Sequence, residues 1–329
     1  MKIAIVKLSA MGDIIHAMVA LQYLKQAKPN IQIDWVVEQG FKEVLENNPH
    51  IDNILTVNLK NIKKNKMALF SEIKKIRSYG KNNYDLVIDA QGLLKSAITA
   101  KILGKKVTGF SKNSIREGIA SYFYNQKIEI AYEENAIIRN IRVLCEPLGI
   151  RLNQEAILMK NKFLYFDTVK KAPINIENYI VFVVGASVKN KIYPKEKFLE
   201  VAKRLNETTV IIWANDYEKE VACYLEEKLE NVMASPKLNL DELKHIIGQS
   251  KLVIGGDTGP THMAWGLNIP SITLFGNTPE KRNTYLTPIN RVLKSKSSVN
   301  PLKLDKEDFS IKKIATHKVI LLAKELLNA

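Results

Sequence analysis

Short apolar runs recur along the chain, and stretches of helical period separate them. The runs are rich in Ile, Val and Leu, and each has the length of a buried strand. They predict strands at 2–8, 31–37, 53–58, 85–90, 106–110, 179–185, 208–214, 251–256 and 270–276. Between them, apolar residues spaced three and four apart predict helices at about 14–27, 41–48, 66–79, 114–124, 135–148, 216–230, 239–249, 261–267 and 311–328. Strands that alternate with helices predict an α/β architecture of parallel sheets covered on both faces.

The alternation is interrupted once, at 150–177, where Pro173 and Asn175 lie in a stretch without a clear period. A chain of 329 residues is also too long for one ordinary core. We therefore predict two Rossmann-like, doubly wound domains at 1–165 and 166–310, and a closing helix at 311–329 that packs back toward the N-terminal domain. Ligands of such sheets bind at the carboxyl ends of the strands. If these edges face each other, the active site is a central cleft.

Positive charge is concentrated in one part of the chain. The chain has 49 Lys and Arg against 34 Asp and Glu, a formal net charge of +15. Residues 60–127 hold 15 basic and four acidic residues, a local net charge of +11. Nucleic acid, an anionic membrane or a phosphate-bearing substrate would each suit this charge. Few aromatic residues interleave the basic cluster at 60–77, which weakens the interpretation as a single-strand nucleic-acid site.

Several classes of protein do not fit this composition. Two cysteines, Cys145 and Cys223, are too few for a disulfide framework or a four-cysteine zinc site. No cluster of His, Cys and Glu has metal-ligand spacing, and neither a Walker A motif nor G-x-G-x-x-G is present. The sequence also has no signal-peptide pattern and no run of about 18 uncharged apolar residues. We expect a cytoplasmic protein that needs no metal or cofactor.

The strongest candidate for a ligand site is the segment LVIGGDTGPTHMAWG at 252–266. A strand ends there in two glycines and turns through Asp-Thr-Gly-Pro into a helix. The N–H groups of Thr258, Gly259 and Thr261, with the helix dipole, would cradle a pyrophosphate. His262 would reach the same phosphates, or it is a buried histidine with structural partners. The alternative for the whole segment is an ordinary strand–turn–helix with a glycine-rich bend.

Two further strand-to-helix turns carry polar residues. In GASVKNKIYP at 185–194, Ser187 and Lys191 follow a strand, and a lysine there would neutralise a departing diphosphate. In KLSAMGDII at 7–15, Asp13 lies near the start of a helix. Helix capping would explain Asp13, but a carboxylate at this edge would also accept a proton from a hydroxyl group.

A fourth turn of this kind is IDAQGLLKSA at 88–97. Asp89, Gln91, Gly92 and Lys95 are expected to project toward a ligand of the first domain. The alternative for Asp89 is a structural role, in which its carboxylate binds the backbone of the turn.

These segments, in this order, resemble the bacterial lipopolysaccharide heptosyltransferases over nearly the whole chain. The GDTGPTH block is shared across those enzymes, whereas DAQGLLKSA and REGIASYFYN resemble the type I enzymes of the inner core. The resemblance implies a GT-B-type fold whose C-terminal domain holds the sugar nucleotide. It implies inverting transfer, without a metal, from ADP-L-glycero-β-D-manno-heptose to a Kdo residue of Kdo-lipid A. It places the protein at the inner face of the inner membrane.

The resemblance also assigns roles to individual residues. It implies that Asp13 is the general base and that Lys191 stabilises the leaving diphosphate. The implied donor-binding residues are Ser187, Lys191, Glu218, Leu238, Asp257, Thr258, Gly259 and His262. Lys60 and Arg116 are expected to meet lipid A phosphates, together with Lys63 and Lys64 of the basic cluster.

Two alternatives to this hypothesis remain. A heptosyltransferase that acts on another core position, of type II or III, is the related one. A non-catalytic binder of anionic membranes or nucleic acid belongs to a different class. No helix-turn-helix, RNA-binding or zinc motif supports nucleic acid. The concentration of positive charge at 60–127, in the domain opposite the donor motif, favours a phosphorylated lipid acceptor.

Overall fold

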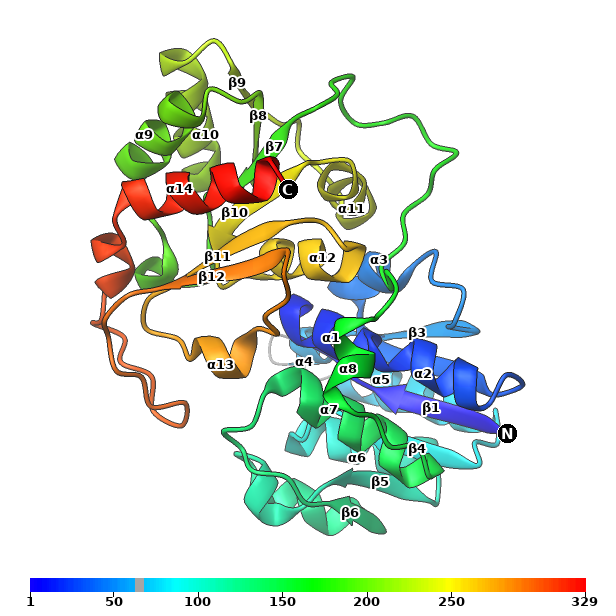
Figure 1. Ribbon diagram of the computed structural model, residues 1–329. Helices are drawn as coiled ribbons and strands as arrows, with labels where there is room; N and C mark the ends of the chain where they lie inside the picture. The colour runs from blue at the N-terminus through cyan, green and yellow to red at the C-terminus, as the bar shows by residue number, and fades with distance from the viewer. Residues whose placement is uncertain (63–67) are drawn as a thin grey trace. The chain divides into compact units, whose positions relative to one another are not determined.

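The predicted alternation of strands and helices builds two parallel six-stranded sheets in the computed structural model, which describes residues 1–62 and 68–329 (Figure 1). Each sheet belongs to a separate compact unit, Met1–Phe163 and Leu164–Ala329. The boundary lies two residues before the expected one, inside the stretch that lacks a period. Lys63 and Lys64, expected to bind the acceptor, lie outside the described residues.

The sheet of the first unit has the strand order β3-β2-β1-β4-β5-β6, all parallel. Its strands are β1 (Lys2–Val6), β2 (Gln32–Glu38), β3 (Asn53–Val57), β4 (Leu86–Asp89), β5 (Val107–Phe110) and β6 (Gln126–Ile128). Its helices are α1 (Met11–Met18), α2 (Ala20–Ala27), α3 (Lys42–Leu45), α4 (Leu59–Ile62), α5 (Ala68–Gly80), α6 (Leu94–Leu103), α7 (Ala136–Cys145) and α8 (Gln154–Leu158). Short 3₁₀ turns are η1 (Gln39–Phe41), η2 (Lys112–Ser114), η3 (Gly118–Phe123) and η4 (Glu146–Leu148). Helices α1, α2 and α7 pack together on one face, and α5, α6 and η3 on the other.

The second unit repeats this arrangement, with the strand order β12-β11-β10-β7-β8-β9. Its strands are β7 (Ile180–Val183), β8 (Thr209–Ile212), β9 (Val232–Ala234), β10 (Leu252–Gly256), β11 (Ser271–Phe275) and β12 (Asn290–Lys294). Its helices are α9 (Lys195–Leu205), α10 (Asp216–Lys228), α11 (Leu240–Gly248), α12 (Gly259–Leu267), α13 (Glu280–Asn283) and α14 (Thr316–Leu327), with 3₁₀ turns η5 (Lys189–Lys191) and η6 (Ser310–Lys313). Helices α9, α10 and α14 pack together, and α11 packs on α12.

Both sheets reverse their strand order at one point, between β1 and β4 in the first unit and between β7 and β10 in the second. Ligands of doubly wound sheets bind beside such a switch point, outside the carboxyl ends of the strands. The turns after β1 and β4, and those after β7 and β10, are therefore where a site is expected in each unit. The predicted α/β class of two doubly wound sheets is confirmed.

All nine predicted strands are present, and three more were missed. The missed strands are β6, β9 and β12, and each is an edge strand of its sheet. An edge strand is less buried than a central one, so its apolar pattern is weaker. The expected helix at 14–27 is two helices that meet at Val19, and the one at 114–124 is mostly 3₁₀.

The C-terminal helix α14 belongs to the core of its own unit. Its side chains Val319, Ile320, Ala323 and Leu326 recur every three or four residues and are buried. They join a cluster with residues of α9, β10 and β11, against which α14 packs. We expected this segment to pack back toward the N-terminal domain, whereas these contacts hold it on the C-terminal sheet. Among the described residues, no helix is both long and apolar enough to cross a bilayer.

Candidate active site

In the second unit, the predicted donor-binding residues follow the carboxyl ends of four adjacent strands. Ser187 and Lys191 follow β7, Glu218 follows β8, Leu238 follows β9, and residues 257–262 follow β10. These strands are neighbours in the order β10-β7-β8-β9. Parallel strands present their carboxyl ends at one edge, so residues dispersed over 76 positions of sequence lie along one edge of the sheet.

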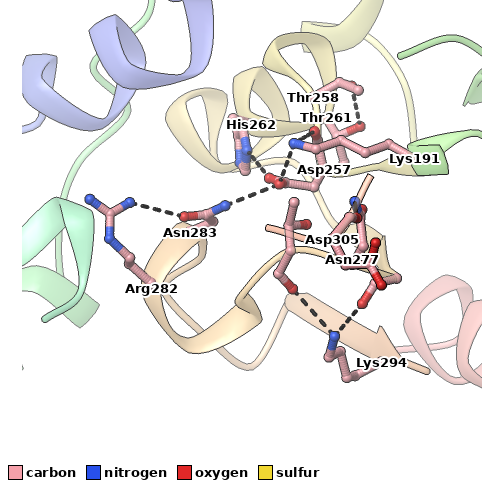
Figure 2. A network of polar contacts seen from close by, with 12 residues as sticks. Lys191, Asp257, Thr258, Thr261, His262, Asn277, Arg282, Asn283, Lys294 and Asp305 are labelled. Atoms are coloured by element: carbon pink, nitrogen blue, oxygen red, sulfur yellow. Dashed lines mark hydrogen bonds and ion pairs between the residues drawn. The ribbon is translucent and has the colours of Figure 1, made fainter. Parts of the chain in front are cut away.

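The carboxylate of Asp257 is the centre of a polar network at the switch point between β10 and β7 (Figure 2). Its Oδ2 lies 2.9 Å from the Nζ of Lys191, which belongs to the loop after β7. Its Oδ1 lies 3.1 Å from the Nε2 of His262 on α12. Asn283, on α13, donates its side-chain N–H to Oδ2 at 3.1 Å. Asp257 thereby ties together three loops that follow neighbouring strands.

Asp257 is buried, yet its partners keep it ionised. Burial alone would raise the pKa of this carboxyl. The hydrogen bond from His262 and the positive charge of Lys191 outweigh burial, and they hold the pKa of Asp257 well below its usual range. The pair of Asp257 and Lys191 is therefore a fixed, oriented ion pair at this edge of the sheet.

The start of α12 offers backbone N–H groups for an anion. Thr258 is the N-cap residue in an extended conformation, and its side chain makes no capping hydrogen bond. Its hydroxyl lies 3.2 Å from that of Thr261 instead. Pro260 suits the first turn because it lacks an N–H group. The N–H groups of Gly259 and Thr261 remain available at the positive end of the helix dipole.

Close packing brings Lys191 to this helix start. A Cβ added to Gly256 would lie 2.8 Å from the backbone carbonyl oxygen of Lys191, which is too close for any side chain. Glycine at the end of β10 therefore lets the loop that carries Lys191 approach the strand. Asn190 fixes the same loop, because its side-chain amide donates to the carbonyl oxygens of Asp305 and Lys306 at 3.2 and 3.0 Å.

The sequence pointed to His262 but not to Asn283. For His262 it allowed either a contact with phosphates or a structural role, and the structure gives this buried ring a structural partner, Asp257. Asn283 was missed altogether. Its own amide oxygen accepts a hydrogen bond from Arg282 at 3.3 Å. The available signal was its position in the polar segment after β11, which is a further carboxyl end on the same sheet.

Glu218 and Leu238 lie at the outer part of the same edge. The Glu218 carboxylate accepts hydrogen bonds from the backbone N–H of Ala214 and the side-chain amide of Asn215, both at 2.7 Å. A Cβ on Gly185 would meet this carboxylate, so Glu218 lies directly against the beginning of the loop that carries Ser187. Leu238 is half-buried just before α11.

In the first unit, Asp13 is the third residue of α1, directly after the switch-point strand β1. It is exposed, and its Oδ2 accepts a hydrogen bond from the N–H of Ala10, the N-cap residue, at 3.3 Å. Asp13 is thus not the N-cap itself, although its carboxylate helps to close the start of the helix. This contact orients an exposed carboxylate at the edge where a ligand is expected.

Gln91 holds the loop in front of Asp13, rather than projecting toward a ligand. Its Oε1 accepts hydrogen bonds from the backbone N–H groups of Leu8 and Ser9, at 3.1 and 3.2 Å. Asp89 takes the structural role that was the alternative for it. This buried carboxylate accepts hydrogen bonds from the N–H of Gln91 at 2.8 Å and the hydroxyl of Tyr124 at 2.7 Å. The switch-point turns after β1 and β4 are thereby locked to each other.

We expect Gln91→Leu to displace the loop that carries Asp13 and to lower the activity of the protein by about tenfold, because a shift of a fraction of an ångström at a functional side chain is costly. Two backbone N–H groups would lose their acceptor, which also costs about 1–3 kcal/mol of stability. Gln91→Glu, which keeps an acceptor oxygen, should restore most of the activity. A turnover number measured at saturating substrates checks this, and equal activity of the leucine and glutamate variants would contradict it.

The predicted acceptor-binding residues that the structure describes are exposed at the same edge. Lys60 follows β3, and its Nζ lies 5.0 Å from the centre of the Phe41 ring. Arg116 follows β5, and its guanidinium lies 5.3 Å from the centre of the Tyr132 ring. Glu38, which sequence reasoning missed, is a buried carboxylate at the end of β2. Burial raises its pKa, and the nearby charges of Lys95 and Lys60 oppose that shift.

Among residues 1–62 and 68–329, no group of three or more His, Cys, Asp or Glu side chains is arranged to hold a metal ion.

Two tandem doubly wound units, each with polar residues in the turns beside its switch point, are the architecture of GT-B-type glycosyltransferases. Comparison with known proteins agrees. The sequence model of glycosyltransferase family 9 (heptosyltransferase) matches residues 73–312. The chain therefore belongs to glycosyltransferase family 9, and the predicted enzyme class is confirmed.

Curated relatives and solved structures extend the likeness to the whole chain. Lipopolysaccharide heptosyltransferase 1 of Campylobacter coli is 37% identical over 345 residues, which cover 100% of this chain and 99% of the relative. The protein of that name from Escherichia coli K12 is 33% identical over 290 residues, covering 84% of this chain and 88% of its own. The structure of the E. coli heptosyltransferase WaaC with ADP-2-deoxy-2-fluoro heptose superposes with a TM-score of 0.82 at 26% identity, covering both chains fully.

Proposed function

We propose that this enzyme transfers L-glycero-D-manno-heptose from ADP-L-glycero-β-D-manno-heptose to a Kdo residue of Kdo-lipid A, with inversion at the anomeric carbon. The observation that carries the proposal is the Lys191–Asp257–His262 network beside the N-terminus of α12. Relatives of this chain bear the name lipopolysaccharide heptosyltransferase 1, and a similar structure holds an ADP-heptose analogue. A diphosphate is the part of such a donor that a cradle of this kind recognises.

On the donor side, the second unit binds the nucleotide and stabilises its departure. The N–H groups of Gly259 and Thr261 and the ammonium group of Lys191 neutralise charge that develops on the diphosphate as the anomeric C–O bond breaks. Asp257 fixes the direction of the Lys191 side chain through a 2.9 Å ion pair. Ser187 adds a hydroxyl to the same loop, Glu218 binds the ribose, and Leu238 packs against the adenine.

On the acceptor side, the carboxylate of Asp13 takes the proton of the attacking Kdo hydroxyl. The hydroxyl oxygen forms the new bond to the anomeric carbon while ADP leaves from the opposite face, which inverts the configuration. The proton ends on Asp13, and the electron pair of the broken bond ends on ADP. General-base assistance of this kind contributes about 10²–10⁴-fold to a rate.

The choice of acceptor is tested by comparison of two substrates. The protein should transfer heptose to heptose-free Kdo-lipid A and leave an already heptosylated core acceptor unchanged. A preference for the heptosylated acceptor would assign the enzyme to a later core position. The anomeric configuration of the isolated product, read by NMR coupling constants, tests inversion, and a retained configuration would contradict the roles given to Asp13 and Lys191.

We propose that the basic cluster of Lys60, Lys63 and Lys64, together with the more distant Arg116, binds the phosphates of lipid A at the cytoplasmic face of the inner membrane. Nucleic acid has no role in this proposal. Charge reversal of Lys60, Lys63 and Lys64 to Glu should lower transfer to vesicle-borne acceptor by at least about tenfold, since each basic residue near an anionic surface contributes about 1 kcal/mol. The Kd of ADP-heptose should stay within about twofold. Equal losses in both measurements would show that the cluster serves the donor or the fold.

A further inference from the structure

The first unit exposes a group of large apolar side chains on α6 and η3. Leu94 and Ile98 on α6 are 38% and 42% exposed, and Ile119 and Tyr122 on η3 are 66% and 70% exposed. We call these four residues the apolar surface. Single exposed apolar residues are ordinary in proteins, whereas a contiguous group indicates an interaction site.

The four side chains belong to one surface. Leu94 and Ile98 are four residues apart and share one side of α6. Ile119 and Tyr122 are three apart and share one side of the 3₁₀ turn. Helix α6 packs against η3, and the N–H of Leu94 donates to the carboxylate of Glu117 at 2.7 Å, immediately before η3. The two exposed faces are therefore joined at the first turn of α6.

The segment that carries the apolar surface is strongly basic. Residues 94–127 contain seven basic residues and a single acidic one, Glu117, which the Leu94 N–H already binds. Lys101 continues the face of α6 that begins with Leu94 and Ile98, Lys105 follows the end of the helix, and both are exposed. Apolar side chains in a segment rich in lysine and arginine suit a phospholipid headgroup region with anionic lipids. An interface with an ordinary protein partner is depleted in lysine instead.

The apolar surface lies at the edge of the sheet that is formed by the carboxyl ends of its strands, where Asp13 also lies. Helix α6 begins after the carboxyl end of β4, and η3 follows the carboxyl end of β5. Both strands continue the sheet next to β1, whose own carboxyl end leads to Asp13. A sugar acceptor held by its acyl chains in a bilayer would reach Asp13 if this edge rests on the lipid.

We propose that the apolar surface docks the enzyme on an anionic bilayer, with Ile98, Ile119 and Tyr122 inserted among the headgroups and the lysines of the same segment on lipid phosphates. This inference rests on the proposed function for its purpose, but the docking is a binding property that is measured without any transfer reaction. It assigns the lipid contact to α6 and η3, apart from the basic cluster around Lys60.

The test is sedimentation of the full chain with vesicles of phosphatidylcholine alone or with phosphatidylglycerol added. The wild-type protein should bind the anionic vesicles, and the triple variant Ile98→Ser, Ile119→Ser, Tyr122→Ser should bind them about 30-fold more weakly. A matched control replaces three exposed apolar residues of the second unit, Val169, Leu302 and Leu321, by Ser and should bind like the wild type. Thermal unfolding of all three proteins verifies that they fold.

The outcomes separate docking from transfer. Transfer to deacylated, bilayer-free acceptor should be the same in the wild type and the triple variant, whereas transfer to vesicle-borne acceptor should fall in the variant only. The docking proposal would be overturned if the triple variant bound the vesicles as tightly as the wild type, or if the wild type did not bind them, whatever the enzyme transfers. A dimer of the wild type that the triple variant abolishes would instead make a second copy of the chain the occupant of this surface. Failure of transfer in every protein, with vesicle binding intact, would count against the proposed function alone.

Discussion

Replacement of Asp13 by Asn should reduce heptose transfer by about 10²–10⁴-fold while donor binding stays unchanged. The amide keeps the size of the side chain but does not accept the proton of the acceptor hydroxyl. Asp13 lies in the first unit, whereas the proposed donor site lies in the second. The Kd of ADP-heptose, measured by calorimetry, should therefore match that of the wild type while the turnover number falls.

Asp13 also closes the start of α1, so a structural effect has to be separated from a catalytic one. Glu242 provides the matched control, because its carboxylate accepts the N–H of the N-cap residue Asn239 at 2.8 Å, as Asp13 does from Ala10. Glu242→Gln should lose a similar amount of stability, about 1 kcal/mol or less, and retain transfer. Near-normal transfer by the Asp13→Asn variant would remove Asp13 as the base.

Replacement of Lys191 by Ala should lower the turnover number by about 10²–10³-fold, the usual loss when one fixed stabiliser of developing charge is removed. The variant also leaves the ionised Asp257 beside the diphosphate without its lysine partner, which weakens donor binding. Lys251→Ala is a suitable control, since Lys251 forms an ion pair with Glu207 at 2.8 Å on the surface of the same unit. Surface pairs of this kind contribute only about 0–1 kcal/mol, and transfer should be unaffected.

Two other results for Lys191→Ala would change the role given to this lysine. If Lys191→Ala turns over like the wild type, the N–H groups of Gly259 and Thr261 carry the charge of the leaving diphosphate without help from the lysine. If it loses donor binding but keeps its turnover number at saturating donor, Lys191 contributes to the ground state and not to the departure of ADP.

Most of the fold could be predicted from the sequence because central parallel strands are buried on both faces. The continuous apolar runs that form β1, β4, β7 and β10 could be recognised without knowledge of their partners. Edge strands such as β6 and β12 are shorter or more polar, and what makes them strands is the neighbour to which they hydrogen bond. Such a neighbour is distant in sequence and leaves no local pattern.

For the candidate site, the sequence indicated the turns but not the contacts within them. Asp257 and Lys191 could be located because each lies in a turn directly after an apolar strand. Their ion pair across 66 residues could not be predicted, and neither could the hydrogen bond that Asn283 donates to Asp257. Gln91 is the clearest example of a side chain whose contacts could not be predicted from the local sequence. Its position after β4 was recognised, but its direction, toward the backbone of residues 8 and 9, follows from the pairing of β1 with β4.

We propose that this enzyme moves heptose from an ADP-linked donor to a Kdo-bearing lipid. The most direct test measures ADP released by the purified protein with ADP-heptose, with Kdo-lipid A, and with both together. We expect rapid release of ADP only when both substrates are present, in step with a heptosylated product. Release that does not depend on the acceptor, or no release with both substrates present, would contradict it.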